Sequence, residues 1–391
     1  MSLRRLESFL DERIGGGDFP GAVFAVDGPG GLIASGARGL RALEPQPEAV
    51  TEDSIYDLAS LTKPLATAAL ATILEREGAL SSADEAGRWI RELKGTDKEA
   101  VTVRQLAVHG SGLPAWLPLY ALGEGIGGYI KAIAGTPPEC PPGTRAIYSC
   151  PGYILLGEIV SRAGGQPLDA LFERLIARPL ALSTLMFKPA PAMLPRTAPT
   201  EKDCVTERSM VRQLGLSYHG WRSGVLRGDV HDGNASGLGG VAGNAGLFGA
   251  ASDLVALGRE LLGRGQGLFQ PREVLRFATL DAARARGEAS AWALRAREHP
   301  VDEAGGPEPR EGREDLRSFG WQMAASPGSA AEGVLPPAAF GHTGFTGTSM
   351  WLDPEAGRSY VLLTNRIHPS DRGTDMNAIR REFHRLAARL A

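Results

Sequence analysis

Several features that mark particular classes of protein are scarce in this sequence. Its 391 residues include only three cysteines, Cys140, Cys150 and Cys204, and this odd number without zinc-site spacing argues against a disulfide framework. No stretch approaches the roughly 20 apolar residues of a membrane-spanning helix. The formal net charge is only -3, so there is no electrostatic reason to expect nucleic acid or an anionic membrane surface as a partner.

An apolar signal-peptide core is also lacking near the first residue. Arg4 and Arg5 are followed by Glu7, Asp11 and Glu12, where an export signal would need a run of apolar side chains. We therefore expect a cytoplasmic enzyme rather than an exported one.

Motifs for metals and nucleotides are missing as well. The seven histidines form no His-Glu-x-x-His or comparable cluster, and the pair His231-Asp232 is better interpreted as part of a hydrogen-bonded loop than as a metal site. The glycine-rich segment 237–249 has no Gly-Lys-Ser/Thr ending, which favours a tight-turning loop beside a site over a phosphate loop. No metal and no cofactor is therefore predicted.

The chain is long enough for two domains, since a domain usually holds about 100 to 200 residues. Strand patterns occur near both ends, whereas the middle is mainly helical in pattern. The expected end elements are an amphipathic helix at 3–14, a hairpin at 22–35, a second hairpin at 349–364 and a final helix at 376–390. The sequence thus predicts an α/β (α+β) fold, with one antiparallel sheet built from both chain ends, flanked by helices, and an inserted helical domain.

We place the sheet domain at residues 1–75 and 256–391, and the mainly helical inserted domain at residues 76–255. Residues 281–317 mix acidic and basic residues with glycine and proline, which predicts a solvated, mobile insertion. Sites often lie between domains, and the first boundary falls close to the most informative stretch of the chain.

That stretch is residues 57–64, followed by an apolar run at 65–74. Because the run is apolar on every face, a helix there should be buried, and Pro64 places its start close to Ser60. Ser60 and Lys63 would then share one face at the helix N-terminus. The serine could be a nucleophile, and desolvation could leave the lysine as a neutral base. No serine lies in a Gly-x-Ser-x-Gly elbow, which argues against an α/β-hydrolase.

Two further elements could complete a site around Ser60. Tyr148 follows a Pro/Gly-rich loop and precedes an expected helix, so its phenol could project into a cleft or simply pack on a domain edge. His342-Thr343-Gly344 lies just before the last hairpin. Gly344 would let a substrate approach the strand backbone closely, or it is an ordinary strand glycine.

These elements match a known pattern in order and spacing. Ser60-x-x-Lys63, then Tyr148-Ser149-Cys150, then His342-Thr343-Gly344 resembles the serine β-lactamase and penicillin-binding superfamily, most closely the class C β-lactamases and related esterases, D-aminopeptidases and DD-peptidases. The resemblance extends from about Phe19 to Arg366 and includes similar phrases at 57–64, 109–114, 152–157 and 342–353.

The resemblance implies a role for each matching residue. Ser60 would be the acylated nucleophile, Lys63 its proton acceptor or electrostatic partner, and Tyr148 the proton shuttle to the leaving group. The backbone N–H groups of Ser60 and Phe345 would form the oxyanion hole. Which of Lys63 and Tyr148 is the base stays open. The residues implied in substrate binding are Cys150, His342, Thr343 and Gly344.

Two positions depart from the family pattern. Cys150 replaces an asparagine that would bind the acyl side chain, and His342 replaces a lysine that would meet a substrate carboxylate; a free imidazole would titrate near pH 6.5. We therefore expect a serine hydrolase that cleaves a small-molecule ester or amide, or a D-amino-acid peptide. The alternatives are a true, weak β-lactamase or D-amino-acid peptidase, and a non-catalytic relative that binds or assembles.

Overall fold

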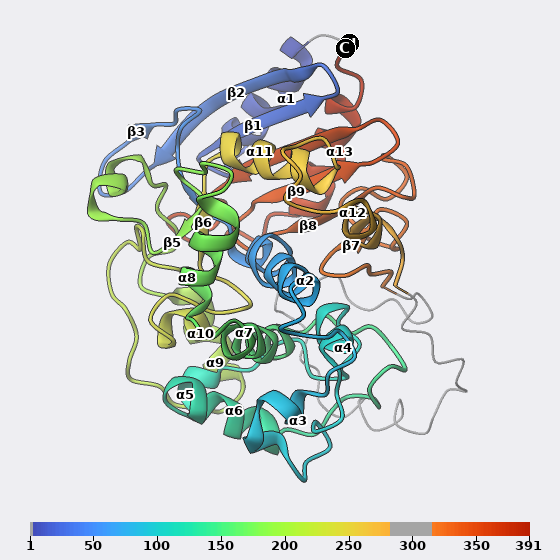
Figure 1. The fold of residues 1–391 in the computed structure, drawn as a ribbon. Helices are drawn as coiled ribbons and strands as arrows, with labels where there is room; N and C mark the ends of the chain where they lie inside the picture. Colours follow the sequence, from blue (N-terminus) through green and yellow to red (C-terminus); the bar gives the residue numbers. More distant parts are fainter. Residues whose placement is uncertain (1–2, 282–314) are drawn as a thin grey trace.

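The computed structural model describes residues 3–281 and 315–391 (Figure 1). The predicted charged insertion at 281–317 therefore lies mostly outside the described residues, but its two ends are inside them. Within the described ranges, every helix is too short or too polar to span a lipid bilayer.

A seven-stranded antiparallel sheet joins the two ends of the chain. The N-terminal part supplies β1 (Gly21–Gly28), β2 (Gly31–Ala42) and β3 (Glu48–Ala49), and the C-terminal part supplies β7 (Gln322–Met323), β8 (Phe340–Thr343), β9 (Ser349–Asp353) and β10 (Arg358–Thr364). The strand order is β3-β2-β1-β10-β9-β8-β7, and the two parts meet where β1 pairs with β10, from Ala22 with Thr364 to Asp27 with Ser359. The predicted sheet of both chain ends is confirmed.

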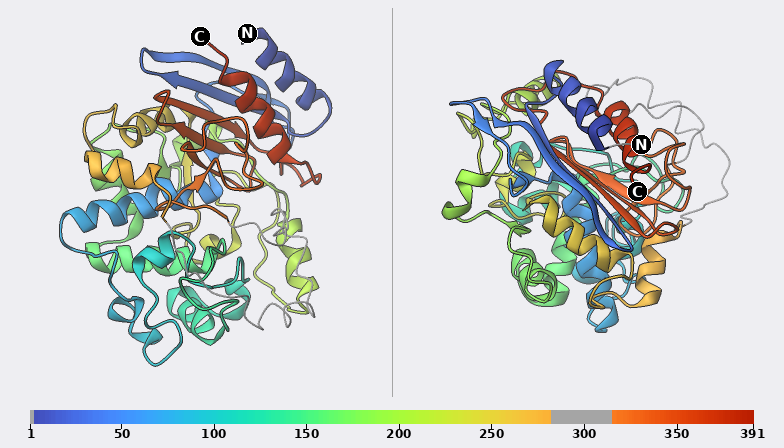
Figure 2. Two further views of the ribbon diagram at one scale, coloured as in Figure 1. Left: turned by 90° about the vertical axis from the view of Figure 1, so that its right-hand side faces the viewer. Right: turned by 90° about the horizontal axis from the view of Figure 1, so that it is seen from above.

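Every residue of β1 is buried because helices cover both faces of the sheet. Ala22, Phe24 and Val26 face one core with α1 (Leu3–Gly15) and α13 (Met376–Ala387), whereas Val23 and Ala25 belong to a second core on the opposite face. This alternation is the two-residue period of a strand. Figure 2 shows α1 and α13 side by side on one face, and α11 (Ala251–Leu261) covers the other face.

The middle of the chain is mainly helical, as predicted, and lies below the sheet in Figure 1. A small sheet of β4 (Tyr56–Asp57), β6 (Leu247–Gly249) and β5 (Met186–Phe187) also forms there. Its helices are α3 (Ala86–Trp89), α4 (Val103–Ala107), α5 (Leu119–Leu122), α6 (Gly125–Gly135), α7 (Cys150–Gly164), α8 (Leu168–Phe172), α9 (Val205–Gln213) and α10 (Gly233–Gly237). Helix α12 (Pro271–Ala278) follows α11 and lies beside β7 (Figure 1). The division into domains stays a prediction, and its boundary at 255/256 falls within α11.

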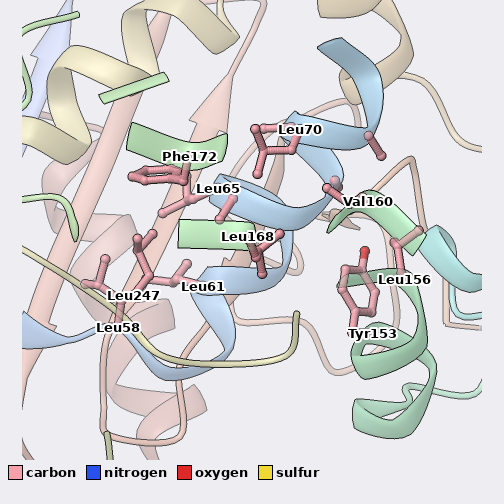
Figure 3. Packing of buried hydrophobic residues seen from close by; sticks show 14 of the residues in the cluster. Leu58, Leu61, Leu65, Leu70, Tyr153, Leu156, Val160, Leu168, Phe172 and Leu247 are labelled. Atoms are coloured by element: carbon pink, nitrogen blue, oxygen red, sulfur yellow. The ribbon is translucent and has the colours of Figure 1, made fainter. Parts of the chain in front are cut away.

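The central helix is the buried segment expected from the apolar run. A 3-10 turn at Ala59–Leu61 leads into a π-helical turn at Lys63–Ala68 and then into α2 (Ala69–Arg76). Every side chain at 61–74 is buried. In Figure 3 its leucines lie among side chains of α7, α8 and β6. The predicted helix start near Ser60 is confirmed, with Pro64 in the first turn.

Leu70→Ala should lower the free energy of unfolding by about 2 to 5 kcal/mol, because it deletes a fully buried side chain and leaves a cavity. Urea denaturation measures the change. Leu275→Ala is the matched control, since Leu275 is 65% exposed and its loss should stay within about 0.5 kcal/mol. Equal losses in the two variants would contradict the placement of the helix in the core.

Candidate active site

Ser60 is held in a strained turn at the start of the central helix. The preceding residue, Ala59, has a φ of +47°, a left-handed conformation that costs a non-glycine residue about 1 to 3 kcal/mol. Two side chains secure it. Ala59 N–H donates to Asp57 Oδ1 at 2.8 Å, and Thr62 Oγ1 donates to the Ala59 carbonyl at 2.7 Å. The turn therefore has its own hydrogen-bonded support directly before Ser60.

The Ser60 hydroxyl is the point at which the predicted residues meet. Lys63 Nζ donates to Ser60 Oγ at 3.0 Å, and Tyr148 OH donates to the same atom at 2.7 Å. Lys63 is fully buried and also donates to the Asn244 carbonyl at 3.0 Å. Asn244 lies in the glycine-rich loop, so that loop borders the site, as expected from its composition.

Tyr148 is positioned by a buried histidine. His109 Nδ1 accepts a hydrogen bond from Ser149 N–H at 2.9 Å, and its ring lies 4.7 Å from the ring of Tyr148, centroid to centroid. Ser149 in turn caps α7, because its Oγ accepts from Gly152 N–H at 3.0 Å. Tyr148 thus precedes a capped helix and points to Ser60 rather than packing on a domain edge.

The charge of Lys63 differs from the expectation. Burial would lower the pKa of Lys63, but its titration is linked to that of Cys150, Tyr148 and Asp232, which oppose burial, and the pKa is raised. This direction favours an ammonium on Lys63 in the resting site, so the neutral amine stays a prediction for the reacting state, and the choice of base between Lys63 and Tyr148 stays open. Burial raises the pKa of Tyr148 against the opposing charge of Lys63, so the phenol is neutral.

The third motif ends β8 beside this turn. His342 and Thr343 are the last residues of the strand, and Gly344 follows. A Cβ at Gly344 would lie 2.6 Å from the carbonyl oxygen of Leu58, too close for any side chain. The backbone that comes close to Gly344 is therefore that of Leu58 in the same chain rather than a substrate.

The turn that carries Phe345 is anchored to the residues just before Ser60. Thr346 Oγ1 donates to the Asp57 carbonyl at 2.7 Å, and Thr348 Oγ1 donates to the Leu58 carbonyl at 3.2 Å. The structure therefore brings the β8 turn and the Ser60 turn together, as the proposed oxyanion hole would require.

His342 is buried, and its titration is not that of a free imidazole. Its Nδ1–H donates to the Thr343 carbonyl at 2.8 Å, which leaves Nε2 as the unprotonated nitrogen. Burial lowers the pKa of His342 well below its usual value, and the positive charges of Arg317 and Lys63 lower it further. The expected titration near pH 6.5 is therefore wrong, and His342 is neutral.

Arg317 is a site residue that sequence reasoning missed. The predicted mobile insertion includes it, yet it is only 7% exposed and its Cζ lies 5.5 Å from the centroid of the Tyr148 ring. Asp315 pairs with it, through Nε at 2.7 Å. The guanidinium of Arg317, paired with Asp315, packs on the ring of Tyr148. This end of the predicted insertion is therefore folded against the site.

Cys150 begins α7 and is 8% exposed. Burial raises the pKa of its thiol, and the neighbouring Lys63 opposes that shift. Cys150 therefore lies beside Lys63 and Tyr148, in agreement with a place in the site, and it is a neutral thiol.

His231 and Asp232 act as hydrogen-bonding residues, as expected. His231 N–H donates to Asp57 Oδ2 at 2.7 Å. Asp232 caps α10 through Oδ1, which accepts from Ala235 N–H at 2.7 Å, and its Oδ2 accepts from Asn244 Nδ2 at 3.1 Å. The described part of the chain holds no group of three or more His, Cys, Asp or Glu side chains placed to bind a metal ion.

Comparison with known proteins gives the class to which this fold and site belong. The model of the Beta-lactamase family matches residues 6–384, and the chain is a member of that family. The crystal structure of a class C beta-lactamase mutant has the same fold, with a TM-score of 0.69 at 16% identity over 98% of this chain and 96% of that chain. The predicted superfamily and the predicted fold class are confirmed.

Relatives of more similar sequence carry names of particular hydrolases. An Escherichia coli (strain K12) protein named "Putative D-alanyl-D-alanine carboxypeptidase" is 31% identical over 83% of this chain and 71% of its own length. A Bacillus subtilis (strain 168) protein named N-acetylmuramyl-L-alanine amidase is 29% identical over 94% of this chain and 81% of its own length. The family is therefore one of hydrolases.

Arg317→Gln should raise the pKa of His342, because the variant removes a positive charge that disfavours the imidazolium while burial stays. An NMR titration of the histidine rings, with His342→Gln to assign the resonance, measures the shift. Arg174→Gln is the control, since Arg174 is exposed and bonds to Gln166. An unchanged His342 titration in Arg317→Gln would contradict the proximity of the two charges.

Proposed function

We propose that this protein is a serine hydrolase that cleaves an ester or amide through an acyl-enzyme on Ser60. The observation that carries the proposal is the double contact on Ser60 Oγ, which accepts from both Lys63 Nζ at 3.0 Å and Tyr148 OH at 2.7 Å. Burying an ammonium and a phenol costs free energy, and groups of this kind cluster at functional sites. Their joint contact with one serine hydroxyl therefore supports a catalytic role for Ser60.

The acylation step follows from these contacts. The Lys63–Tyr148 pair first releases one proton, after which it accepts the hydroxyl proton of Ser60 as Oγ attacks the carbonyl carbon. The carbonyl bond opens to an oxyanion, and the pair then delivers the proton to the leaving oxygen or nitrogen as that bond breaks. In deacylation, water attacks the carbonyl carbon of the acyl-enzyme and gives a proton to the same pair. The pair then returns that proton to Ser60 Oγ as the bond between Oγ and the acyl carbon breaks, and the acyl group leaves as an acid.

The oxyanion would be stabilised by backbone N–H groups of Ser60 and Phe345. Support comes from the anchoring of the Phe345 turn, in which Thr346 and Thr348 bond to the residues just before Ser60. Fixed donors aimed at a developing negative charge need no rearrangement during reaction, which is why such sites are effective.

The substrate class follows from the residues that differ from the family pattern. Cys150 offers only weak hydrogen bonds, so small or apolar acyl groups fit better than amide-bearing ones. Neutral His342 is a poor partner for a carboxylate, and the Arg317 guanidinium beside Tyr148 is already paired with Asp315. We propose a short acyl ester or amide as substrate.

A second candidate is a D-amino-acid peptidase or a weak β-lactamase. The names of the two curated relatives favour an amide substrate of the peptide class. A panel of p-nitrophenyl esters, nitrocefin and D-alanyl peptides distinguishes these activities. A purely binding or assembling protein would hydrolyse none of them.

Ser60→Ala should lower hydrolysis by about 10^4-fold or more while the fold is kept, since binding alone cannot replace the nucleophile. Mass spectrometry after reaction with a fluorophosphonate should locate the label on Ser60 in the wild type and find none in the variant. Ser161→Ala on α7 is the control and should label normally. Labelling of the Ser60→Ala variant would show that another residue is the nucleophile.

Cys150→Asn should raise kcat/KM for nitrocefin by about 3-fold to 100-fold, because one added hydrogen bond contributes about 0.5 to 1.5 kcal/mol, or up to about 3 for a buried polar group. Hydrolysis of p-nitrophenyl acetate should change little. Cys140→Asn, at a half-buried cysteine in the loop before Tyr148, is the control. If both activities fall together with thermal stability, Cys150 has a packing role and does not meet substrate.

A further inference from the structure

Phe345 carries one of the two proposed oxyanion donors, and polar side chains from two distant segments contact its ring, which is partly buried. The imidazole of His231 stacks on it with centroids 5.5 Å apart and planes at 17°. The guanidinium of Arg366 lies over the same ring, with Cζ 4.7 Å from the centroid. We propose that His231 and Arg366 are positioning residues that hold Phe345 and so aim its N–H at the oxyanion, an inference that rests on the proposed function.

Arg366 also holds the backbone of Phe345. Its Nε donates to the Phe345 carbonyl at 2.9 Å, and Nη1 pairs with Asp371 Oδ1 at 2.7 Å. Arg366 N–H donates to the Thr346 carbonyl at 2.9 Å. The peptide groups on both sides of Thr346 are thereby tied to one arginine that follows β10, so the orientation of the Phe345 backbone depends on it.

His231 is itself held rigidly from two directions. Its ring Nε2 lies 3.1 Å from Glu201 Oε2, and its backbone N–H donates to Asp57 Oδ2 at 2.7 Å. His231 is 5% exposed and Glu201 is fully buried. A buried pair of this kind fixes ring orientation, since breaking it would leave an unpaired charge away from water.

Asp57 connects the two oxyanion donors. One carboxylate oxygen accepts from Ala59, the residue before Ser60, and the other accepts from His231, whose ring contacts Phe345. The same residue's carbonyl accepts from Thr346. A single carboxylate thus links the segment that carries the Ser60 N–H to the segment that orients the Phe345 N–H.

The experiment compares steady-state kinetics per active site, counted by fluorophosphonate labelling. His231→Ala and Arg366→Ala should each lower kcat by about 10-fold to 100-fold with less than a 3-fold change in KM, because oxyanion donors act in the transition state. Arg358→Gln, which removes an arginine bonded to the carbonyls of Ala388 and Leu390 just after α13, is the control and should keep wild-type kcat.

A double-mutant cycle separates positioning from general loss of packing. Phe345→Ala keeps the backbone N–H but removes the ring, so adding His231→Ala to it should cost less than 2-fold more. The variant with His231→Phe and Glu201→Gln keeps a stacked ring without an unpaired charge and should recover most of kcat. If His231→Ala or Arg366→Ala does not fold, the effect on kcat is still measured with the His231→Phe, Glu201→Gln double variant and with Arg366→Lys.

The outcomes distinguish this inference from the proposed function. A wild type that is not labelled at Ser60 overturns both. If the wild type is labelled and active, but the His231 and Arg366 variants keep kcat within 2-fold of it, only the positioning role is overturned. Fully additive losses of His231→Ala and Phe345→Ala would also overturn it, because independent effects exclude action through the Phe345 ring.

Discussion

The buried ammonium of Lys63 is the constraint on which the rest of the site depends. An amine without access to water has to find acceptors for its N–H groups, because an unpaired buried charge costs several kcal/mol. Here Ser60 Oγ and the Asn244 carbonyl accept from it, and they come from the helix start and from the glycine-rich loop. The hydrogen bonds of this one amine therefore join the central helix to the loop before β6. Tyr148, which also bonds to Ser60 Oγ, adds the start of α7.

The same constraint explains why the central helix has to be surrounded. The apolar helix that starts with Ser60 and Lys63 is buried because it lies between the sheet and α7, with its leucines among side chains of α7, α8 and β6 (Figures 1 and 3). The two ends of the chain build that sheet, so the site is completed by residues from both. Strain at Ala59 is tolerated because Asp57 and Thr62 hold it, which is typical of sites whose geometry is maintained by the surrounding fold.

Much of this could be predicted from sequence because its signals are local. The apolar run and Pro64 locate the central helix, the two-residue period locates the hairpins, and the spacing of Ser60, Lys63, Tyr148 and His342 carries the family resemblance. What could not be predicted depends on contacts between distant segments. The raised pKa of Lys63 comes from acids elsewhere in the chain, and the neutrality of His342 comes from burial and from a cation in a segment whose composition indicated a solvated insertion.

The pairing of β1 with β10 has a consequence for biosynthesis. Strand β1 is made together with β2, whereas β10, the strand that covers its other edge, is made only after residues 29–357. Until then, the free edge of β1 exposes unpaired backbone N–H and C=O groups, and its two faces expose side chains that are buried in the final fold. Such edges invite association between chains, and closing contacts over so long a separation is slow. The interval between the synthesis of β1 and that of β10 is thus the time in which association between chains is most favoured.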